Sequence, residues 1–258
     1  MTEEIIKQTV LFLITFVANL FASVSGGGAG FIQFPMLILL GLHFATALGT
    51  HKVAVVFLGL GAIARKKNLR NFGFDRTISI IMLTLGCASV VAGSVIIISV
   101  PSDIAQIVLG FITIASGIYT LYKKDFGKRN IENRSAARTL IGTLCICLIG
   151  MFSGSLSSGA GLFATLTLAG VFGLELKRAI MHTMVFVATI WNAVGAVTIG
   201  ALTGIHWQWL PVMIIAAFLG AFLGTSLLIK LSTSKVRLIF SLVSILSGGL
   251  LIYEGFSV

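Results

Sequence analysis

Long apolar segments without a charged residue constrain this chain most. Residues 78–100 and 104–122 are two such segments, and comparable ones fill most of the 258 residues. A helix of about 20 apolar residues crosses the hydrocarbon core of a bilayer. The composition agrees, because 57% of the residues are hydrophobic and 10% are charged. We therefore predict an all-α polytopic membrane protein whose surroundings are a lipid bilayer.

The basic residues gather between the apolar segments. All of the 18 Lys and Arg except Lys7 and Lys52 fall into four clusters, at 65–76, 123–138, 177–178 and 230–237. The linkers near 41–46, 101–103 and 203–209 contain none. Because cytoplasmic loops collect Lys and Arg, we place the four clusters inside and both termini outside. The same distribution argues against a nucleic acid partner, despite the net charge of +10.

A glycine- and serine-rich motif occurs twice, 131 residues apart. The first copy is residues 21–31 (FASVSGGGAGF) and the second is residues 152–162 (FSGSLSSGAGL). At this offset, linker 101–103 corresponds to 232–234 and linker 41–46 to 172–177, and basic residues lie in or beside only the second member of each pair. Equivalent loops should therefore lie on opposite membrane faces, which predicts two inverted repeats.

Each repeat is predicted to be a glycine-broken helical hairpin followed by three transmembrane helices. The hairpins pair 5–24 with 31–40 and 139–153 with 162–171, and the further crossings are 45–63, 78–100, 104–122, 179–202, 210–229 and 236–253. The second hairpin arms have about 10 residues, or roughly 15 Å, half the thickness of a bilayer core, which puts both glycine tips near the midplane. Whether the longer first arms cross stays open. The resulting domains are residues 1–122, a basic cytoplasmic linker at 123–138, and residues 139–258.

The two tips are candidate anion sites. Glycine lets a helix unwind, and the helix that restarts presents free N–H groups and the positive end of its dipole. Carriers built from inverted repeats bind substrate at such breaks, whereas tight helix packing through small residues is the alternative. The candidate residues are Ser23, Ser25, Gly26, Gly27, Gly28 and Gly30 in the first copy and Ser155, Ser157, Ser158, Gly159 and Gly161 in the second.

Lys52 is a further candidate because it lies about eight residues into segment 45–63. An intramembrane charge is a functional hypothesis by default. No Asp or Glu lies deep in an apolar segment to pair with Lys52, which indicates that its counter-charge is the substrate. A snorkelling or a neutral lysine is the alternative. The other candidate contacts are His51, its counterpart His182 at the 131-residue offset, Thr50, Thr183 and Asn192, and for the histidines a packing role is the alternative.

Residues 27–37 (GGAGFIQFPML), followed by Gly41-Leu42 and by 47–50 (ALGT), resemble the TauE/SafE sulfite exporter family of bacterial membrane proteins. The resemblance covers essentially the whole chain and implies transport of sulfite, sulfoacetate or related organosulfur anions across the inner membrane. Gln33 lies in this motif and joins the candidate substrate-binding residues. The second motif lacks the proline of the family pattern, and His51-Lys52 follows the Gly-Thr pair, so a substrate other than sulfite stays open.

Together these features predict a secondary transporter, in the direction of export, that exposes one midplane anion site alternately to the two sides. An anion channel is the first alternative. An intramembrane hydrolase using Ser157 or Ser158 with His182 is the second, although no GxSxG spacing surrounds these serines. We expect no enzymatic activity, no catalytic residue, no cofactor and no metal site. The expected partners are the small anionic substrate, the bilayer and, as a possible assembly, a second copy in a homodimer.

Overall fold

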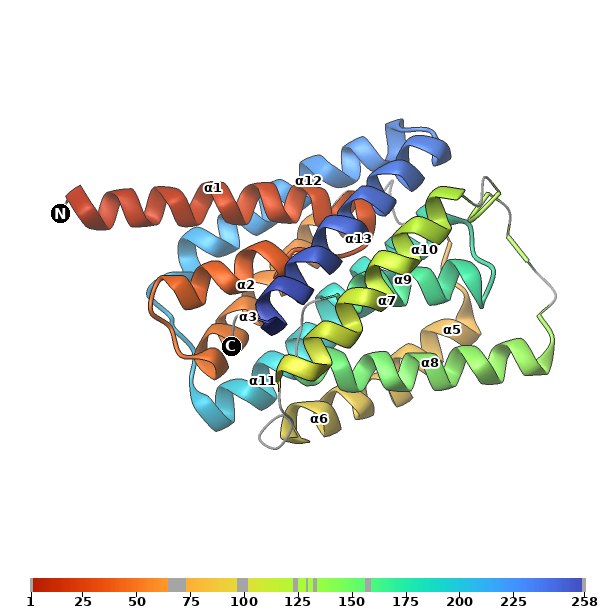
Figure 1. Cartoon of the computed structure of the whole chain (residues 1–258), viewed down its shortest axis with the longest axis horizontal. Coiled ribbons are helices and arrows are strands. Elements are labelled where there is room, and N and C mark those ends of the chain that lie inside the picture. The colour runs from red at the N-terminus through yellow and green to blue at the C-terminus, as the bar shows by residue number, and fades with distance from the viewer. Residues whose placement is uncertain are drawn as a thin grey trace.

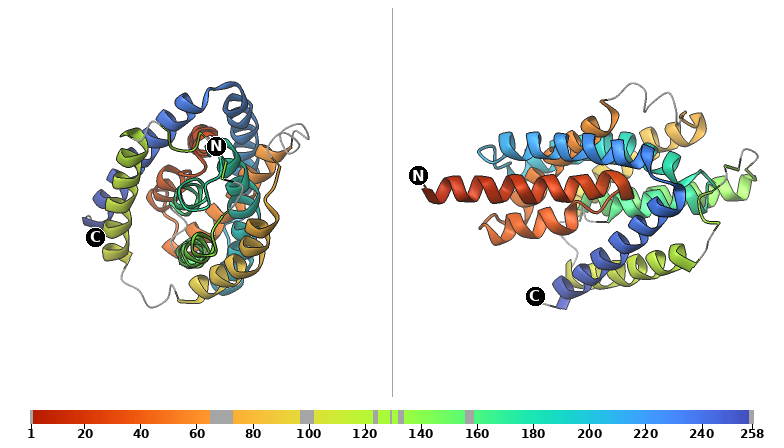
Figure 2. Two further views of the ribbon diagram at one scale, coloured as in Figure 1. Left: turned by 90° about the vertical axis from the view of Figure 1, so that its right-hand side faces the viewer. Right: turned by 90° about the horizontal axis from the view of Figure 1, so that it is seen from above.

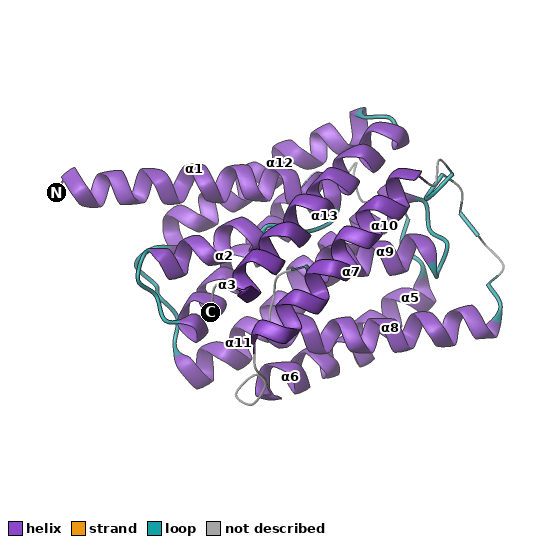
Figure 3. Cartoon of the chain, viewed as in Figure 1, coloured by secondary structure: helices purple, strands orange, loops and turns teal. Residues whose placement is uncertain are grey.

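The computed structural model describes residues 2–64, 73–96, 102–122, 125–128, 130–131, 134–155 and 159–256, and within these ranges every regular element is a helix (Figures 1 and 3). The first half contains α1 (Thr2–Ser25), α2 (Gly30–Leu39), α3 (Phe44–Ile63), α5 (Arg76–Ile81), η1 (Met82–Gly86), α6 (Cys87–Ile96) and α7 (Ser102–Tyr122). The second half contains α8 (Ala136–Ser155), α9 (Ala160–Gly170), α10 (Leu176–Thr183), η3 (Met184–Trp191), α11 (Asn192–Thr203), α12 (Leu210–Lys230) and α13 (Thr233–Phe256). The all-α prediction is confirmed for this part of the chain.

Among the described residues, seven helical segments are long and apolar enough to cross a membrane. They are Glu4–Ser25, Phe44–Ile63, Arg76–Ile96, Ala136–Ser155, Leu176–Thr203, Leu210–Lys230 and Thr233–Leu250. The first arms of both hairpins are among them, so both have the length to cross. Helix faces that point away from the protein are apolar, as on α8, where Leu140 and Leu144 are 62% and 57% exposed. This confirms a multi-pass membrane protein.

Each half begins with a long helix, a glycine-rich break and a short helix. The short helices α2 and α9 have 10 and 11 residues, close to the length predicted for the second arms. In Figure 1, α1 runs from the left toward the centre and α8 runs from the right, and each short helix turns back toward the side from which its partner came. The two hairpins therefore run in opposite directions. The membrane face from which each one enters stays a prediction.

Packing contacts recur between the halves at the 131-residue offset. Gly224 on α12 lies against the main-chain carbonyl of Leu20 on α1, with no space for a Cβ. The equivalent Gly93 on α6 lies in the same way against the carbonyl of Met151 on α8. Small residues at such positions let two helix backbones approach closely inside a membrane. In these two contacts, helices that correspond in sequence pack on corresponding partners.

The helices α7 and α13 also correspond at this offset, and they pack against each other along one side of the molecule (Figure 2). Gly117 on α7 faces the carbonyl of Ser241, and Gly248 on α13 faces the carbonyl of Gly110. Through α13 this pair contacts the hairpins, because Phe240 packs in one apolar cluster with residues that follow the two glycine breaks. The pair therefore closes one side of the region where the hairpins meet.

Two of the membrane segments contain a π-helical stretch, η1 and η3, and they contact each other there. The indole Nε1 of Trp191 donates a hydrogen bond of 2.8 Å to the carbonyl of Met82, and Gly86 lies against the indole ring. π-Helical turns are rare and frequent at functional sites. At the end of η3, Asn192 Nδ2 donates to the carbonyl of Val187 over 2.8 Å, which fixes the amide.

Candidate functional site

The two glycine breaks, here called the tips (Gly26–Gly30 and Gly159–Gly161), meet each other in the interior. A Cβ on Gly27 would lie 2.6 Å from the main-chain nitrogen of Leu162. A Cβ on Gly161 would lie 2.6 Å from the carbonyl oxygen of Gly26. Gly26 and Gly159 have φ values of +85° and +83°, which L side chains rarely adopt. Glycine is thus required both for the breaks and for the contact between them.

A small cavity of about 40 Å³ lies between the tips. On this measure a cavity needs about 10–15 Å³ to hold one water molecule, so this one has room for a few. Both halves build the wall: Ala22, Gly26, Gly27, Gly28, Ala29, Gly30, His51, Val55 and Leu58 come from the first, and Ser153, Gly159, Ala160, Gly161, Thr183, Met184, Val187, Ala188 and Asn192 from the second. The cavity therefore lies at the junction of the two halves.

Both short helices direct their N-terminal ends at this cavity. Its wall includes the first residues of α2 and of α9, and no side chain caps either N-terminus. At α2 the N–H groups of Phe31, Ile32 and Gln33 donate to carbonyls of the tip, and at both helices the dipole is positive at this end. Two such ends on one cavity favour the binding of an anion.

Two polar side chains of the wall have a buried atom without a hydrogen-bond partner among the described residues. These atoms are His51 Nδ1 and Asn192 Oδ1, in side chains that are 1% and 5% exposed. Leaving such an atom unpaired costs about 1–3 kcal/mol. A molecule in the cavity that pairs with them would recover this energy. The Asn192 Oδ1 atom can only accept a hydrogen bond, so a ligand that pairs with it must donate one.

Lys52 lies directly behind the cavity wall and is completely buried. Its Nζ donates to the main-chain carbonyl of Ser153, a wall residue near the C-terminal end of α8. The carbonyls and the dipole of a helix C-terminus attract a cation. Neither of the two ion pairs found among the described residues includes Lys52. Lys52 Nζ is therefore held next to the cavity by a carbonyl, and no carboxylate among the described residues pairs with it.

The described serines of the tips make local hydrogen bonds and lie outside the cavity wall. Ser23 Oγ donates to Leu20 O (2.9 Å), Ser25 Oγ to Phe21 O and Gly27 O (2.9 and 2.8 Å), and Ser155 Oγ to Met151 O (3.1 Å). Ser157 and Ser158 lie outside the described residues. The hydroxyls of Ser23, Ser25 and Ser155 thus satisfy carbonyls at the ends of α1 and α8, and the main chain of the tips forms the wall.

The other predicted polar residues divide between the wall and its surroundings. Thr183 lies in the wall, where its Oγ1 is 2.9 Å from Thr165 Oγ1. Thr50 Oγ1 accepts from the main-chain N–H of His206 at 2.9 Å and so ties α3 to the loop before α12. Gln33 is fully buried between α1 and α2. Thr50 and Gln33 are therefore near the cavity but outside its wall.

Sequence reasoning missed Ser153 and Thr165. Ser153 holds Lys52 and lines the cavity, and Thr165 Oγ1 donates to the carbonyl of Gly26 at 3.3 Å. At the 131-residue offset Ser153 corresponds to Ala22, and both residues line the cavity. Within the described ranges, no group of three His, Cys, Asp or Glu residues could hold a metal ion.

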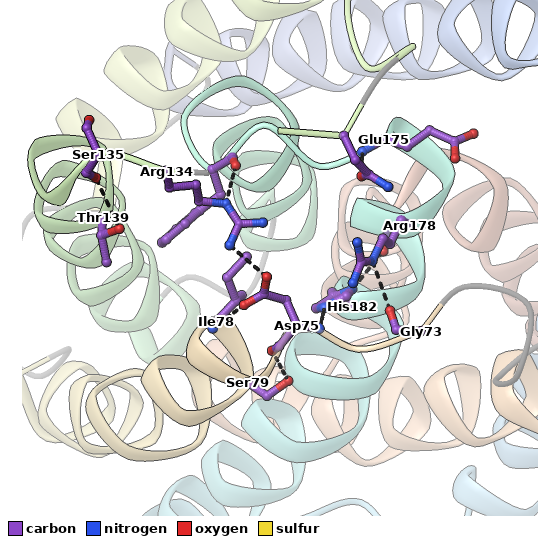
Figure 4. A network of polar contacts seen from close by, with 12 residues as sticks. Gly73, Asp75, Ile78, Ser79, Arg134, Ser135, Thr139, Glu175, Arg178 and His182 are labelled. Carbon is purple, nitrogen blue, oxygen red and sulfur yellow. Dashed lines mark hydrogen bonds and ion pairs between the residues drawn. The ribbon is translucent and has the colours of Figure 1, made fainter. Parts of the chain in front are cut away.

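His182 lies outside the wall, in a network of polar contacts at one end of the bundle (Figure 4). Its Nε2 accepts from the main-chain N–H of Asp75 at 3.0 Å, and its Nδ1 donates to the carbonyl of Arg178 at 2.9 Å. These two bonds require the neutral ring with its proton on Nδ1. The two histidines at equivalent sequence positions thus differ. His51 faces the cavity, whereas both ring nitrogens of His182 form hydrogen bonds with main-chain groups.

The same network joins the linker to both halves. Arg134 Nη1 donates to Asp75 Oδ2 at 2.7 Å, and Arg134 Nε donates to the carbonyl of Phe172 at 2.6 Å. Burial raises the pKa of the Asp75 carboxyl, but hydrogen bonds from Arg134 and from the N–H of Ile78, with the charges of Arg134 and Arg178, outweigh burial and lower that pKa below its ordinary value. Arg134 thereby docks its part of the predicted linker on the protein.

Comparison with known proteins agrees with this membrane architecture. The family model described as sulfite exporter TauE/SafE matches residues 11–251. A protein of Haemophilus influenzae named "Probable membrane transporter protein" is 28% identical over 251 residues, which cover 95% of this chain and 94% of that protein. The "Probable membrane transporter protein YfcA" of Escherichia coli K12 is 27% identical, over 95% of this chain and 89% of that protein. No solved structure matches this chain.

Proposed function

Because this chain belongs to the TauE/SafE sulfite exporter family, and its relatives are named as membrane transporters, we propose that it carries a small oxyanion across the inner membrane of a bacterium. Sulfite, or an organosulfonate such as sulfoacetate, is the proposed substrate class. The relatives are named as transporters and not as enzymes, which argues against the hydrolase alternative.

The observation that carries the proposal is that two helix N-termini and Lys52 meet at one cavity built by both halves. Each helix N-terminus is equivalent to about half an elementary charge. The C-terminal ends of α1 and α8 adjoin the same tips and carry the opposite partial charge, so a protonated Lys52 supplies the net positive charge. A net positive site suits an oxyanion and disfavours a cation.

The unpaired Asn192 Oδ1 makes the proposal more specific. Oxyanion oxygens accept hydrogen bonds from the N–H groups at the tips, but they cannot satisfy an acceptor. A singly protonated oxyanion, such as hydrogen sulfite, has an O–H group that can donate to this atom. His51 Nδ1, which also lacks a partner, takes either role according to its tautomer. We therefore propose that a monoprotonated form is the species that binds best.

Alternating access is the mechanism that best fits a small cavity with walls from both halves. Opening on one side requires one hairpin to move away from the other half, and the tips then separate on that side only. The cytoplasm is electrically negative, so moving one net negative charge outward gains about 2.3 kcal/mol per 100 mV. Export of the anion can therefore proceed without a coupling ion.

We also propose the orientation that follows from the basic residues. The network of Asp75, Arg134 and His182 lies at the end of the bundle where the linker and Arg178 are found. Positive residues collect on the cytoplasmic side, so this end would face the cytoplasm and the N-terminal end of α1 would face outward. Alkaline phosphatase fused after the last residue should then be active, and the same enzyme fused within residues 125–131 should be inactive.

The test is flux into proteoliposomes with an imposed membrane potential. Labelled sulfite or sulfoacetate should accumulate on the positive side, and Lys52→Met should abolish this accumulation. Unitary currents in a planar bilayer would instead support the anion channel. Transport of cations that is unaffected by Lys52→Met would refute an anion carrier of either kind.

A further inference from the structure

The hairpin of α1 and α2 contains a second buried polar cluster, outside the wall of the central cavity. It consists of Thr15 and Asn19 on α1 and Gln33 on α2, each 0% exposed. Asn19 Nδ2 donates to Gln33 Oε1 at 3.2 Å and to the carbonyl of Thr15 at 2.6 Å. Thr15 Oγ1, Asn19 Oδ1 and Gln33 Nε2 are left buried without a partner among the described residues. Three such atoms in one cluster point to a ligand or to water.

The cluster lies along the hairpin, next to residues of the cavity wall. Residues three and four apart lie on one face of a helix, so Asn19 shares a face of α1 with Ala22, which lines the cavity. On α2, Gln33 follows the wall residue Gly30 by one turn in the same way. At 1.5 Å per residue, Asn19 lies about 4.5 Å beyond Ala22 and Thr15 about 10 Å beyond it. The polar row thus leads from the cavity toward the N-terminal end of α1.

An apolar plug ends this row. Leu11, one turn beyond Thr15, and Leu37, one turn beyond Gln33, are both 0% exposed. They belong to one core cluster with Trp209 and Met213 of the α12 region. The polar row therefore lies between the cavity wall and a group of buried apolar side chains.

The second hairpin shows that this cluster is dispensable for the packing of such a hairpin. At the 131-residue offset, the counterparts of Thr15, Asn19 and Gln33 are Ile146, Gly150 and Ala164. None of these counterparts has a polar side chain, yet α8 and α9 form an equivalent hairpin. Hydrogen bonds between membrane helices commonly serve packing, but here the equivalent hairpin packs without them.

We propose that Thr15, Asn19 and Gln33 form a second, uncharged station for the transported oxyanion and its water, between the central cavity and the outer face. This inference rests on the proposed function. The amide and hydroxyl groups replace part of the hydration shell as the anion leaves the positive tips, and the absence of charge keeps the binding weak enough for release. The anion leaves when the plug at Leu11 and Leu37 opens.

The first test does not depend on the identity of the substrate. In a background in which Cys87, Cys145 and Cys147 are replaced by serine, Thr15→Cys is compared with Ile146→Cys at the equivalent, equally buried position. A membrane-impermeant methanethiosulfonate reagent is added on the side of the N-terminal end of α1. We expect Thr15→Cys to react about tenfold faster or more, because thiols react as solvated thiolates. Equal rates for the two variants, or no reaction at Thr15→Cys, would overturn the proposal even if anion transport is established.

The second test separates a path from helix packing. Thr15→Val and the double variant Asn19→Leu/Gln33→Met should retain anion binding within about twofold and keep the wild-type melting temperature. Thr15 Oγ1 has no partner to lose, and the double variant replaces both partners of the Asn19–Gln33 hydrogen bond. Flux should fall about tenfold, whereas Ile146→Val should leave flux unchanged. A lower melting temperature with flux reduced only in proportion to the folded protein would show a packing role. Wild-type flux in both variants would also refute the station while leaving the central anion site intact.

Discussion

The Lys52 ammonium group donates a hydrogen bond to the main-chain carbonyl of Ser153, 101 residues further along the chain. The bond joins α3 of the first half to the end of α8 in the second half. Any movement that separates the second hairpin from α3 must break it. Lys52 is therefore both the charge closest to the cavity and a contact that depends on the relative position of the two halves.

Lys52→Met should abolish anion flux without unfolding the protein. The substitution removes the charge beside the cavity but keeps most of the side-chain volume, and replacing a buried charge with an apolar group is often neutral or stabilising. We expect flux to fall by about tenfold or more, since a hydrogen bond or close contact with a charged group contributes about 1.5–3 kcal/mol. Proteoliposome flux and thermal unfolding in detergent measure the two effects. Lys7→Met, outside the bundle interior, is the control and should transport normally.

The two equivalent histidines should give opposite results. His51→Ala should weaken anion binding several-fold with little loss of stability, because His51 Nδ1 has no partner to lose. His182→Ala should lower the melting temperature, because it leaves the N–H of Asp75 without its acceptor, at a cost of about 1–3 kcal/mol. Calorimetric titration with sulfite and thermal unfolding would measure both variants. The assignment fails if His182→Ala alters affinity and His51→Ala alters only stability.

Gly161→Ala should destabilise the protein through the contact between the tips. The added Cβ would lie 2.6 Å from the carbonyl oxygen of Gly26 and 2.9 Å from Gly27 Cα, and main-chain atoms cannot easily yield. Overpacking of this kind costs about 1–3 kcal/mol. Gly249→Ala on α13 is the matched control, because nothing lies within 4 Å of its added Cβ. The control should unfold at or above the wild-type temperature, and an equal loss in both variants would contradict contact between the tips.

The ion pair of Asp75 and Arg134 should make stability depend on acidic pH. The pKa of Asp75 is lower in the folded state than its ordinary value of 3.8, so its ionised form stabilises the fold above that pH, and this contribution is lost as the pH falls through the lowered pKa. Asp75→Asn should therefore melt below the wild type at pH 7, and the difference should shrink as the pH falls below 3.8 and disappear below the lowered pKa. Asp125→Asn, in the exposed pair with Lys128, should change little. A difference between wild type and Asp75→Asn that does not shrink as the pH falls below 3.8 would indicate a role other than charge.

The sequence by itself determined the helices and the positions of their breaks. The length of an apolar stretch identifies a membrane-spanning helix, because a main chain in hydrocarbon must form its hydrogen bonds within the segment. The predicted segment 45–63 is α3 at Phe44–Ile63, and the predicted short arms 31–40 and 162–171 are α2 and α9 within a few residues. Glycine clusters mark the breaks because few other residues adopt the positive φ values seen at Gly26 and Gly159.

The tertiary structure alone decided what each polar side chain does. Which way a helical residue points depends on the rotation of its helix against neighbours that are distant in sequence. His51 and His182 occupy equivalent positions, yet one faces the cavity and the other meets Asp75, because the two halves differ in the side chains around them. The partner of Lys52 is a carbonyl of the other half, which no local pattern contains. Helix formation is local in a membrane, whereas the assignment of donors to acceptors is settled only when the helices pack.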